Sequence, residues 1–287
     1  MSLIWGLNFA VLKFGTRALE PLAFNGTRMV IGSVALLAAA RLIAPSRPRG
    51  TDLRKLLALG VLGHGVYQVF FITGLAMTRA GSAALVVASS PAVIAVVGRL
   101  LGVEHVSRRA AVGIVLSMLG LAFVVLGSAR AGVRGEESVL GDLLILASTV
   151  AWAFYTNILR GHTARIEGIQ IAAWTLVGGT VPLLLVATPQ LARVEWSAVT
   201  PLAWGALLYG GVGALGIAYL FWYRGVRVIG STRTAMFSQL QPLVALLGAW
   251  AMLGERPTSW QLLGSVAVMG GLLLTREPDA PEPAHGE

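Results

Sequence analysis

The sequence contains an internal repeat, and this feature limits the possible folds more than any other. Residues 60–121 align with residues 211–272 at a constant offset of 151, without a gap. The identical pairs include Gly60/Gly211, Gly65/Gly216, Gly74/Gly225, Pro91/Pro242, Glu104/Glu255, Gly113/Gly264 and Gly120/Gly271. An alignment that keeps its glycines and prolines in register indicates an internal duplication. At an offset of 147, Trp5 also aligns with Trp152, so the repeat spans most of each half.

The composition places this repeat in a membrane. Apolar residues make up 56% of the chain, charged residues only 12%, and the mean hydropathy is +0.76. Ten stretches approach the roughly 20 apolar residues that cross a bilayer. They are residues 2–14, 21–43, 54–77, 80–102, 109–127, 139–159, 166–188, 198–223, 230–253 and 258–275. The first stretch is too short to cross the hydrocarbon, so we expect the native start to lie several residues upstream, or the sequence to have been trimmed. We do not expect a signal peptide, because the stretch lacks a positive region.

Ten spans divide into two sets of five, and an odd number reverses the orientation of the second set. We therefore predict an all-α integral membrane fold of ten transmembrane helices, arranged as two inverted five-helix repeats. The repeats cover residues 1–127 and 139–275, and the polar loop 128–138 joins them. Residues 276–287 are predicted to be a disordered cytoplasmic tail. Inverted repeats are a recurring architecture of transporters, whose substrate site lies near the midplane.

The net charge of +9 and the pI near 11.0 can indicate nucleic-acid binding, but the positions of the 22 Lys and Arg residues give another interpretation. If the N-terminus is cytoplasmic, fourteen of them lie in inner loops or the tail, seven lie in outer loops, and Arg28 lies within a span. This bias follows the positive-inside rule and predicts that both termini are cytoplasmic. We therefore expect a lipid bilayer as surroundings and no nucleic acid as a partner. The absence of cysteine excludes disulfides and thiolate metal sites.

Several short motifs carry a resemblance to a known family. The segment Ile-Trp-Gly-Leu-Asn-Phe at 4–9, with Lys13, Pro21 and Arg28, resembles the first two helices of an EamA domain. Gly254-Glu255 followed by Pro257 is similar to the closing signature of that domain. The resemblance covers nearly the whole chain and implies the drug/metabolite transporter superfamily, with ten helices in two EamA repeats. Within it, the chain is most similar to bacterial YddG-type exporters of aromatic and other neutral amino acids.

The polar residues within the predicted spans offer little for catalysis. All thirteen Asp and Glu residues lie near span ends, in loops or in the tail, so no pair of carboxylates can meet at the midplane. His64 is the only deep histidine, and a lone histidine forms neither a metal site nor a nucleophilic triad. We therefore expect no enzyme activity, no metal and no cofactor.

The spans do offer aromatic and amide side chains for a substrate path. The candidates are His64, Tyr67, Gln68 and Phe71 on the third span, Trp5 and Asn8 on the first, Trp152 and Tyr155 on the sixth, Tyr219 and Trp222 on the eighth, Ser90 on the fourth, and Gln239 and Gln241 on the ninth. Such a lining can stack a flat side chain and orient a zwitterion. The alternatives are interfacial anchoring for the aromatic residues and hydrogen bonding between helices for the polar ones.

Three further residues have a mechanical or electrostatic interpretation. Pro91 and Pro242 each remove a backbone donor in mid-span, which predicts symmetric kinks that act as gates or only shape the packing. Arg28 is deep enough to need a partner. It either binds a substrate carboxylate or neutralises carbonyls at a helix end and fixes the first two helices.

These observations predict an inner-membrane transporter that exports small neutral metabolites, chiefly amino acids including aromatic ones, by alternating access. The missing midplane carboxylate favours uncoupled transport, although a proton could be carried by His64, whose unperturbed pKa is about 6.5. The alternative is an exporter of nucleobases, sugars or drugs, with proton coupling. From a different class, a non-transporting membrane scaffold or a lipid-modifying enzyme remains open. We infer no obligate protein partner.

Overall fold

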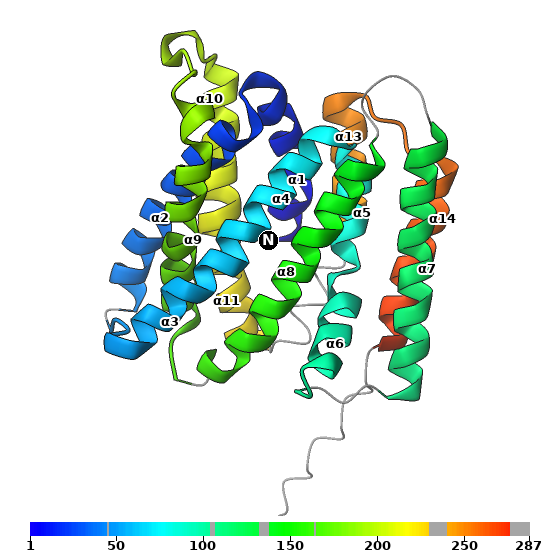
Figure 1. The fold of residues 1–287 in the computed structure, drawn as a ribbon, viewed down its shortest axis with the longest axis horizontal. Coiled ribbons are helices and arrows are strands. Elements are labelled where there is room, and N and C mark those ends of the chain that lie inside the picture. The colour runs from blue at the N-terminus through cyan, green and yellow to red at the C-terminus, as the bar shows by residue number, and fades with distance from the viewer. Residues whose placement is uncertain (45, 104–106, 132–137, 164, 230–239, 276–287) are drawn as a thin grey trace, which may run out of the picture.

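A computed structural model describes residues 1–44, 46–103, 107–131, 138–163, 165–229 and 240–275. Within these residues the chain is helical and contains no strand (Figure 1). The first half contains α1 (Ser2–Ala18), α2 (Pro21–Ile43), α3 (Gly50–Gly60), η1 (Val61–Val66), α4 (Tyr67–Met77), α5 (Ala80–Ala88), α6 (Ser90–Leu100) and α7 (Arg108–Ala131). The second half contains α8 (Val139–Thr163), α9 (Gly168–Leu191), η2 (Trp196–Ala198), α10 (Pro201–Leu208), η3 (Tyr209–Ile217), α11 (Ala218–Ile229), α13 (Gln241–Leu253) and α14 (Ser259–Thr275).

Length and hydropathy identify several helical stretches that can cross a bilayer. Six stretches of the described residues meet both criteria: Pro21–Ile43, Gly50–Met77, Ala80–Leu100, Val139–Leu159, Gly168–Leu191 and Pro201–Trp222. Each coincides with a predicted span. The other four predicted spans do not meet these criteria over the described residues, so the count of ten stays a prediction. The first helix ends at Ala18, beyond the predicted residue 14. The predicted tail at 276–287 and most of the predicted loop, residues 132–137, lie outside the described residues.

Local sequence signals explain where the helices begin and end. Pro21 and Pro201 occupy the first turn of α2 and α10, where the missing N–H is not needed. Thr200 caps α10 by accepting a hydrogen bond from the backbone N–H of Ala203 at 3.3 Å. Gly254 ends α13 with a φ of 71°, a left-handed conformation that glycine adopts without a steric penalty.

Two segments, η1 and η3, are π-helical, which the helical spacing of the sequence did not predict. η1 covers Val61–Val66, and the repeat offset of 151 places its counterpart at residues 212–217, within η3. A π-helical turn widens the helix and leaves some carbonyls without their usual partner, and such turns are frequent at functional sites. Both segments are glycine-rich, and their glycines at 63, 65, 210, 211 and 216 are buried, whereas Val61 and Ile217 are exposed.

The helices contact one another closely at glycines, in places through their backbones. α7 packs along α14 at one edge of the molecule, and α2 and α9 pack together near the other (Figure 1). A side chain at Gly120 of α7 would approach the carbonyl oxygen of Gly264 in α14 to 2.7 Å. Of the predicted glycine face in the eighth span, Gly210 and Gly211 contact α2 closely, whereas Gly213 and Gly216 have only ordinary contacts.

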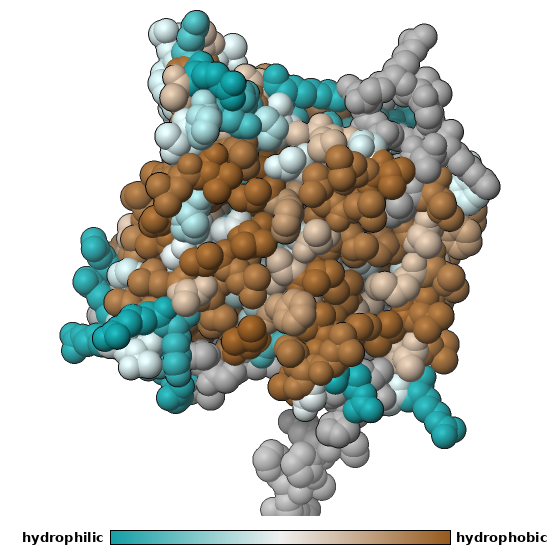
Figure 2. Space-filling view, viewed as in Figure 1, coloured by the Kyte–Doolittle hydropathy of each residue, from teal (hydrophilic) through white to brown (hydrophobic). Residues whose placement is uncertain are grey.

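The outer surface matches a hydrocarbon environment. Large apolar side chains are exposed along the helices, including Val34 at 63%, Leu185 at 72% and Val266 at 73%. In the space-filling view, apolar residues cover the middle of the visible face, and hydrophilic residues gather at its upper and lower ends (Figure 2). A soluble protein of this size does not expose so large a continuous apolar surface, because water would favour its association.

The close contact between α7 and α14 generates the first prediction. Replacing Gly120 with Leu should lower the free energy of unfolding by about 2 to 3 kcal/mol, because the new side chain meets the α14 backbone, which cannot move aside cheaply. Unfolding of the purified protein in detergent would measure this loss. The matched control is Gly205→Leu, because a side chain added at Gly205 meets nothing within 4 Å. Equal stability of the two variants would contradict the prediction.

Candidate functional site

A cavity of about 1370 Å³ lies between the helices of both halves. Its lining comes from α1, α2, η1, α4, α5 and α6 of the first half, and from α8, α9, η3, α11 and α13 of the second. The lining reaches one end of the bundle at Ile43, Glu167 and Arg224, all of which are exposed. At the opposite end the lining stops short of the helix ends. The cavity is therefore asymmetric along the helices.

The structure brings most of the predicted site residues together in this cavity. Its lining includes Trp5, Asn8, Arg28, His64, Tyr67, Gln68, Phe71, Ser90, Pro91, Trp152, Tyr155, Tyr219, Trp222, Gln241 and Pro242. Gln239 lies outside the described residues. Several lining residues were not predicted, among them Ala84 and Ala88 of α5 and Ile169, Ile171 and Ala172 of α9. Small apolar residues look the same in a sequence whether they line a cavity or pack a core, so no pattern could have identified them.

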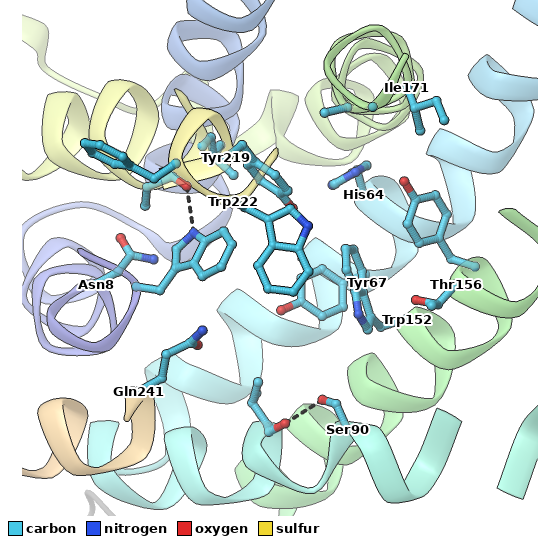
Figure 3. Close-up of a pocket in the computed structure, with 18 of the residues that line it drawn as sticks. Asn8, His64, Tyr67, Ser90, Trp152, Thr156, Ile171, Tyr219, Trp222 and Gln241 are labelled. Carbon is cyan, nitrogen blue, oxygen red and sulfur yellow. Dashed lines mark hydrogen bonds between the residues drawn. The ribbon is translucent and has the colours of Figure 1, made fainter. Parts of the chain in front are cut away.

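One aromatic cluster is formed by Trp5, Tyr219 and Trp222. The Trp5 ring meets the Tyr219 ring edge-on at 5.4 Å and lies 6.0 Å from the Trp222 ring. The Trp5 indole N–H donates to the carbonyl oxygen of Ala214 at 2.9 Å, within the π-helical η3 (Figure 3). The half-buried Trp5 side chain is thus tied to a backbone carbonyl of η3 and lines the cavity.

A second aromatic cluster is formed by His64, Tyr67, Trp152 and Tyr155. Ring centroids lie 5.9 Å apart for His64 and Trp152, 5.5 Å for His64 and Tyr155, and 5.4 Å for Tyr67 and Trp152. The two His64 pairs are edge-to-face and the Tyr67–Trp152 pair is tilted, and such spacings and geometries are favourable for aromatic pairs. Trp222 projects into the space between Asn8 and this second cluster (Figure 3). The space between the two clusters is therefore walled by aromatic rings.

His64 has no hydrogen-bond partner among the described residues. The ring is buried in η1, and its contacts are the edges and faces of Trp152 and Tyr155. A side chain at Gly179 of α9 would collide with the His64 Cβ, so the backbone of α9 holds this turn in place. The alternative that we left open, a hydrogen bond between helices, is not found in the part of the chain that the structure describes.

Arg28 is buried and is held by two amide side chains. Its Nη2 donates to Asn25 Oδ1 at 2.7 Å and to Gln68 Oε1 at 2.9 Å, and its Nε donates to Asn25 Oδ1 at 3.1 Å. Asn25 in turn donates to Gln68 Oε1 at 3.3 Å. The network joins α2 to α4. The predicted alternative, in which Arg28 neutralises carbonyls and fixes α1 to α2, is therefore wrong in both its partners and its helices.

Two buried polar atoms beside the cavity have no hydrogen-bond partner among the described residues. They are Oδ1 of Asn8 on α1 and Oγ1 of Thr156 on α8, and both residues line the cavity. A buried acceptor without a partner is costly, so such atoms usually await a water or a ligand. The cavity thus offers unoccupied acceptors on both of its sides.

The helix of the fourth predicted span is interrupted next to Pro91, where we predicted a kink. α5 ends at Ala88 and α6 begins at Ser90, followed by Pro91. Pro91 cannot donate to the carbonyl oxygen of Val87, and the Ser90 hydroxyl donates to that oxygen instead, at 2.5 Å (Figure 3). Pro242 lies in the first turn of α13, and the residues before Leu240 lie outside the described residues.

The end of the bundle opposite the cavity mouth is closed by charged side chains at the turn between α4 and α5. Lys13 is buried, and its ammonium donates to the carbonyl oxygens of Leu75 at 3.1 Å and Ala76 at 2.9 Å. These are among the last carbonyls of α4, where a cation is stabilised by the helix dipole. Lys13 therefore ties α1 to the end of α4.

A complementary contact secures the beginning of α5. The Glu255 carboxylate accepts hydrogen bonds from the backbone N–H groups of Ala80 at 3.2 Å and Gly81 at 3.4 Å, and it pairs with Arg79 at 3.8 Å. An anion at a helix N-terminus is the favourable counterpart of a cation at a C-terminus. Between the two helices, the Thr78 hydroxyl donates to Asp142 of α8 at 2.7 Å. The turn thus connects both halves of the chain.

No group of three or more His, Asp or Glu residues that could hold a metal ion occurs in the described part of the chain. Acidic residues are also scarce in the cavity. Among the described lining residues Glu167 is the only acid, and it is exposed at the mouth. The chemistry offered here is therefore binding through aromatic faces, amides, hydroxyls and one buried guanidinium.

Comparison with known proteins gives related sequences along the whole chain. A transporter of Archaeoglobus fulgidus is 27% identical over 94% of both chains. A probable amino-acid metabolite efflux pump of Salmonella typhimurium is 27% identical over 94% of this chain and 90% of its own. A probable terminal-alkyne amino-acid exporter of Streptantibioticus cattleyicolor is 27% identical over 94% of this chain and 89% of its own.

A solved crystal structure and a family match complete the comparison. The crystal structure has the same fold, with a TM-score of 0.63 and 22% identity, over 96% of this chain and 95% of the other. The sequence model of the EamA-like transporter family matches residues 1–126 and 139–276. The chain is therefore an integral membrane protein that belongs to the EamA-like transporter family, the EamA type of drug/metabolite transporter.

Proposed function

We propose that this transporter exports small neutral metabolites, chiefly amino acids including aromatic ones, by uncoupled alternating access. The observation that carries the proposal is the central cavity, in which two aromatic clusters face each other beside free amide and hydroxyl acceptors. Aromatic walls stack a flat or apolar side chain, and a small number of polar groups orient it. Two relatives named for amino-acid export support the substrate class.

The proposed architecture is two inverted repeats, residues 1–127 and 139–275. Three features of the structure support it. The π-helical segments η1 and η3 occupy equivalent positions, and η1 packs on α9 as η3 packs on α2. The hydroxyl of Ser117 donates to the carbonyl oxygen of Val268, its partner residue at the repeat offset of 151. In this arrangement the cavity lies at the interface between the repeats, where inverted-repeat transporters bind substrate.

The direction of opening follows from the proposed topology. With both termini in the cytoplasm of an inner-membrane protein, the exposed mouth at Ile43 and Glu167 faces the cytoplasm. The contacts of Lys13 and Glu255 then close the outer end. Alternating access requires that these contacts separate when the inner end closes. The break at Ser89 and Pro91 provides a point where the fourth span can bend during this exchange.

A counterflow assay in proteoliposomes tests the substrate class. We expect saturable exchange of labelled phenylalanine, methionine and threonine at equal pH, and no exchange of a nucleobase or a sugar. Trp152→Leu should raise the KM for phenylalanine about ten-fold, because the loss of an aromatic contact costs about 0.5–1.5 kcal/mol beyond the area that the ring buries. Trp204→Leu on α10 is the matched control, since Trp204 does not line the cavity and is 38% exposed.

The outcomes of this assay separate the competing functions. Exchange of the nucleobase or the sugar, with no exchange of amino acids, would replace the proposed substrate class. Exchange that requires an imposed pH gradient would instead establish proton coupling, and His64 would be the first residue to replace. If no solute moves under either condition, the scaffold interpretation gains support.

Cysteine accessibility tests the direction of opening, and the chain contains no native cysteine to interfere. We expect a cysteine introduced by Ala88→Cys, within the cavity lining, to react with an impermeant maleimide several-fold faster from the cytoplasmic face. Thr51→Cys at the start of α3 and Ser197→Cys in η2 calibrate the two faces, because both are exposed at opposite ends of the bundle. Faster labelling of Ala88→Cys from the face that labels Ser197→Cys would refute the proposed orientation.

A further inference from the structure

The buried guanidinium of Arg28 has no counterion among the described residues. The ion pairs in the described part of the chain are Arg79–Glu255, Arg165–Asp52 and Arg193–Glu20, and none involves Arg28. Its partners are the amide oxygens of Asn25 and Gln68, which supply dipoles but no charge. A buried charge that lacks a counterion is expensive, and an ionisable side chain within a membrane span usually pairs with another group or marks a substrate path.

The guanidinium also retains free hydrogen-bonding capacity toward the cavity. Its three hydrogen bonds to protein groups use Nε and Nη2, so Nη1 has no acceptor in the described part of the chain. Arg28 lines the cavity together with Tyr67, Gln68 and Tyr219. The planar fork of a guanidinium binds a carboxylate with matched geometry, which an ammonium group cannot reproduce.

Packing holds this side chain in a fixed position. A Cβ added at Gly210 of η3 would lie 2.6 Å from Cδ of Arg28, so the backbone of the π-helical segment contacts the aliphatic part of the side chain. The two amide oxygens hold the other end. A cation that is already ordered loses little entropy when a ligand binds, which favours its use as an anchor.

Among the described lining residues, no buried carboxylate is available to pair with an ammonium group, which can contact only aromatic faces and neutral oxygens. Glu167, the only described acid of the lining, is exposed at the mouth, whereas Arg28 lies in the buried part. The free acceptors, Asn8 Oδ1 and Thr156 Oγ1, are neutral. A neutral oxygen accepts a hydrogen bond from an ammonium, a hydroxyl or a water with little discrimination. The guanidinium of Arg28 is therefore the one buried formal charge among the described lining residues, and its sign matches a carboxylate.

We propose that Arg28 binds the carboxylate of the transported molecule, and that this carboxylate, rather than the α-amino group, is the group that the cavity requires. The cavity then accepts aromatic and apolar monocarboxylates that lack an amino group as well as amino acids. This inference rests on the proposed function, because it names the chemical group that the same cavity recognises in its substrate.

Equilibrium binding to the purified, full-length protein tests the proposal with four probes of similar shape. They are phenylalanine, 3-phenylpropionate, which lacks the ammonium, and phenethylamine and phenylalaninamide, which lack the carboxylate. Binding can be followed by tryptophan fluorescence, because Trp5, Trp152 and Trp222 line the cavity. We expect phenylalanine and 3-phenylpropionate to bind within about ten-fold of each other, and the two probes without a carboxylate to bind at least ten-fold more weakly.

Substitution of Arg28 assigns the effect to this residue. Arg28→Met should weaken both carboxylate probes by roughly 10- to 100-fold, because a charge-assisted pair of hydrogen bonds is lost. Arg28→Lys, which keeps the charge without the fork, should fall between Arg28→Met and the unaltered protein. Arg41→Met is the matched control, since Arg41 is exposed on the same helix and does not line the cavity. Unchanged carboxylate binding in folded Arg28→Met would overturn the proposal.

Probe binding to the unaltered protein tests the carboxylate requirement even if the Arg28 variants fail to fold. Binding of phenethylamine as tight as that of 3-phenylpropionate would overturn the carboxylate requirement. Binding of phenylalanine without binding of 3-phenylpropionate would do the same, while leaving the proposed amino-acid function intact. If the folded protein binds none of the four probes, both this inference and the proposed aromatic amino-acid substrate fail.

Discussion

The exclusion of water from the bilayer is the constraint on which the rest of this structure depends. In hydrocarbon each backbone N–H and C=O must find its partner inside the protein, so the described apolar stretches are helical and only short turns and loops connect them. The same constraint directs apolar side chains outward and leaves the interior for polar and aromatic groups. Where the backbone departs from the α-helix, other groups complete its hydrogen bonds, as the Ser90 hydroxyl does at Val87 and the Trp5 indole does at Ala214.

Because hydrocarbon provides no hydrophobic force between helices, close packing must hold them together. Glycines supply it at the flanks of the molecule, where Gly120 meets α14 and Gly178 meets the backbone of α3. In the centre, bulky rings keep the helices apart and enclose a cavity. The charged contacts of Lys13 and Glu255 close one end of this cavity. Each uses the dipole of a helix end as its partner.

Much of the cavity lining could be predicted, because polar side chains within apolar spans avoid lipid and face the interior, and the aromatic candidates lie near them at helical spacing. His64, Tyr67, Trp152 and Tyr219 were selected on that basis, and all line the cavity. The face of α5 and the start of α9 were not predicted, since alanine and isoleucine carry no signal of function. The π-helical segments were also missed, because they consist almost entirely of glycine and apolar residues, which show no periodicity from which a wider turn could be recognised.

The sequence by itself determined the helical class, the membrane environment and the duplication, because these depend on hydropathy and on residues such as Pro91 and Pro242 that recur at a fixed offset. Only the tertiary structure decided which end of the cavity is closed and what surrounds Arg28. Those properties depend on contacts between residues far apart in the chain, such as Lys13 with Ala76 and Arg28 with Gln68. A local pattern cannot encode them, because a buried charge has the same neighbours in sequence whether a carboxylate, a carbonyl or an amide lies opposite it in space.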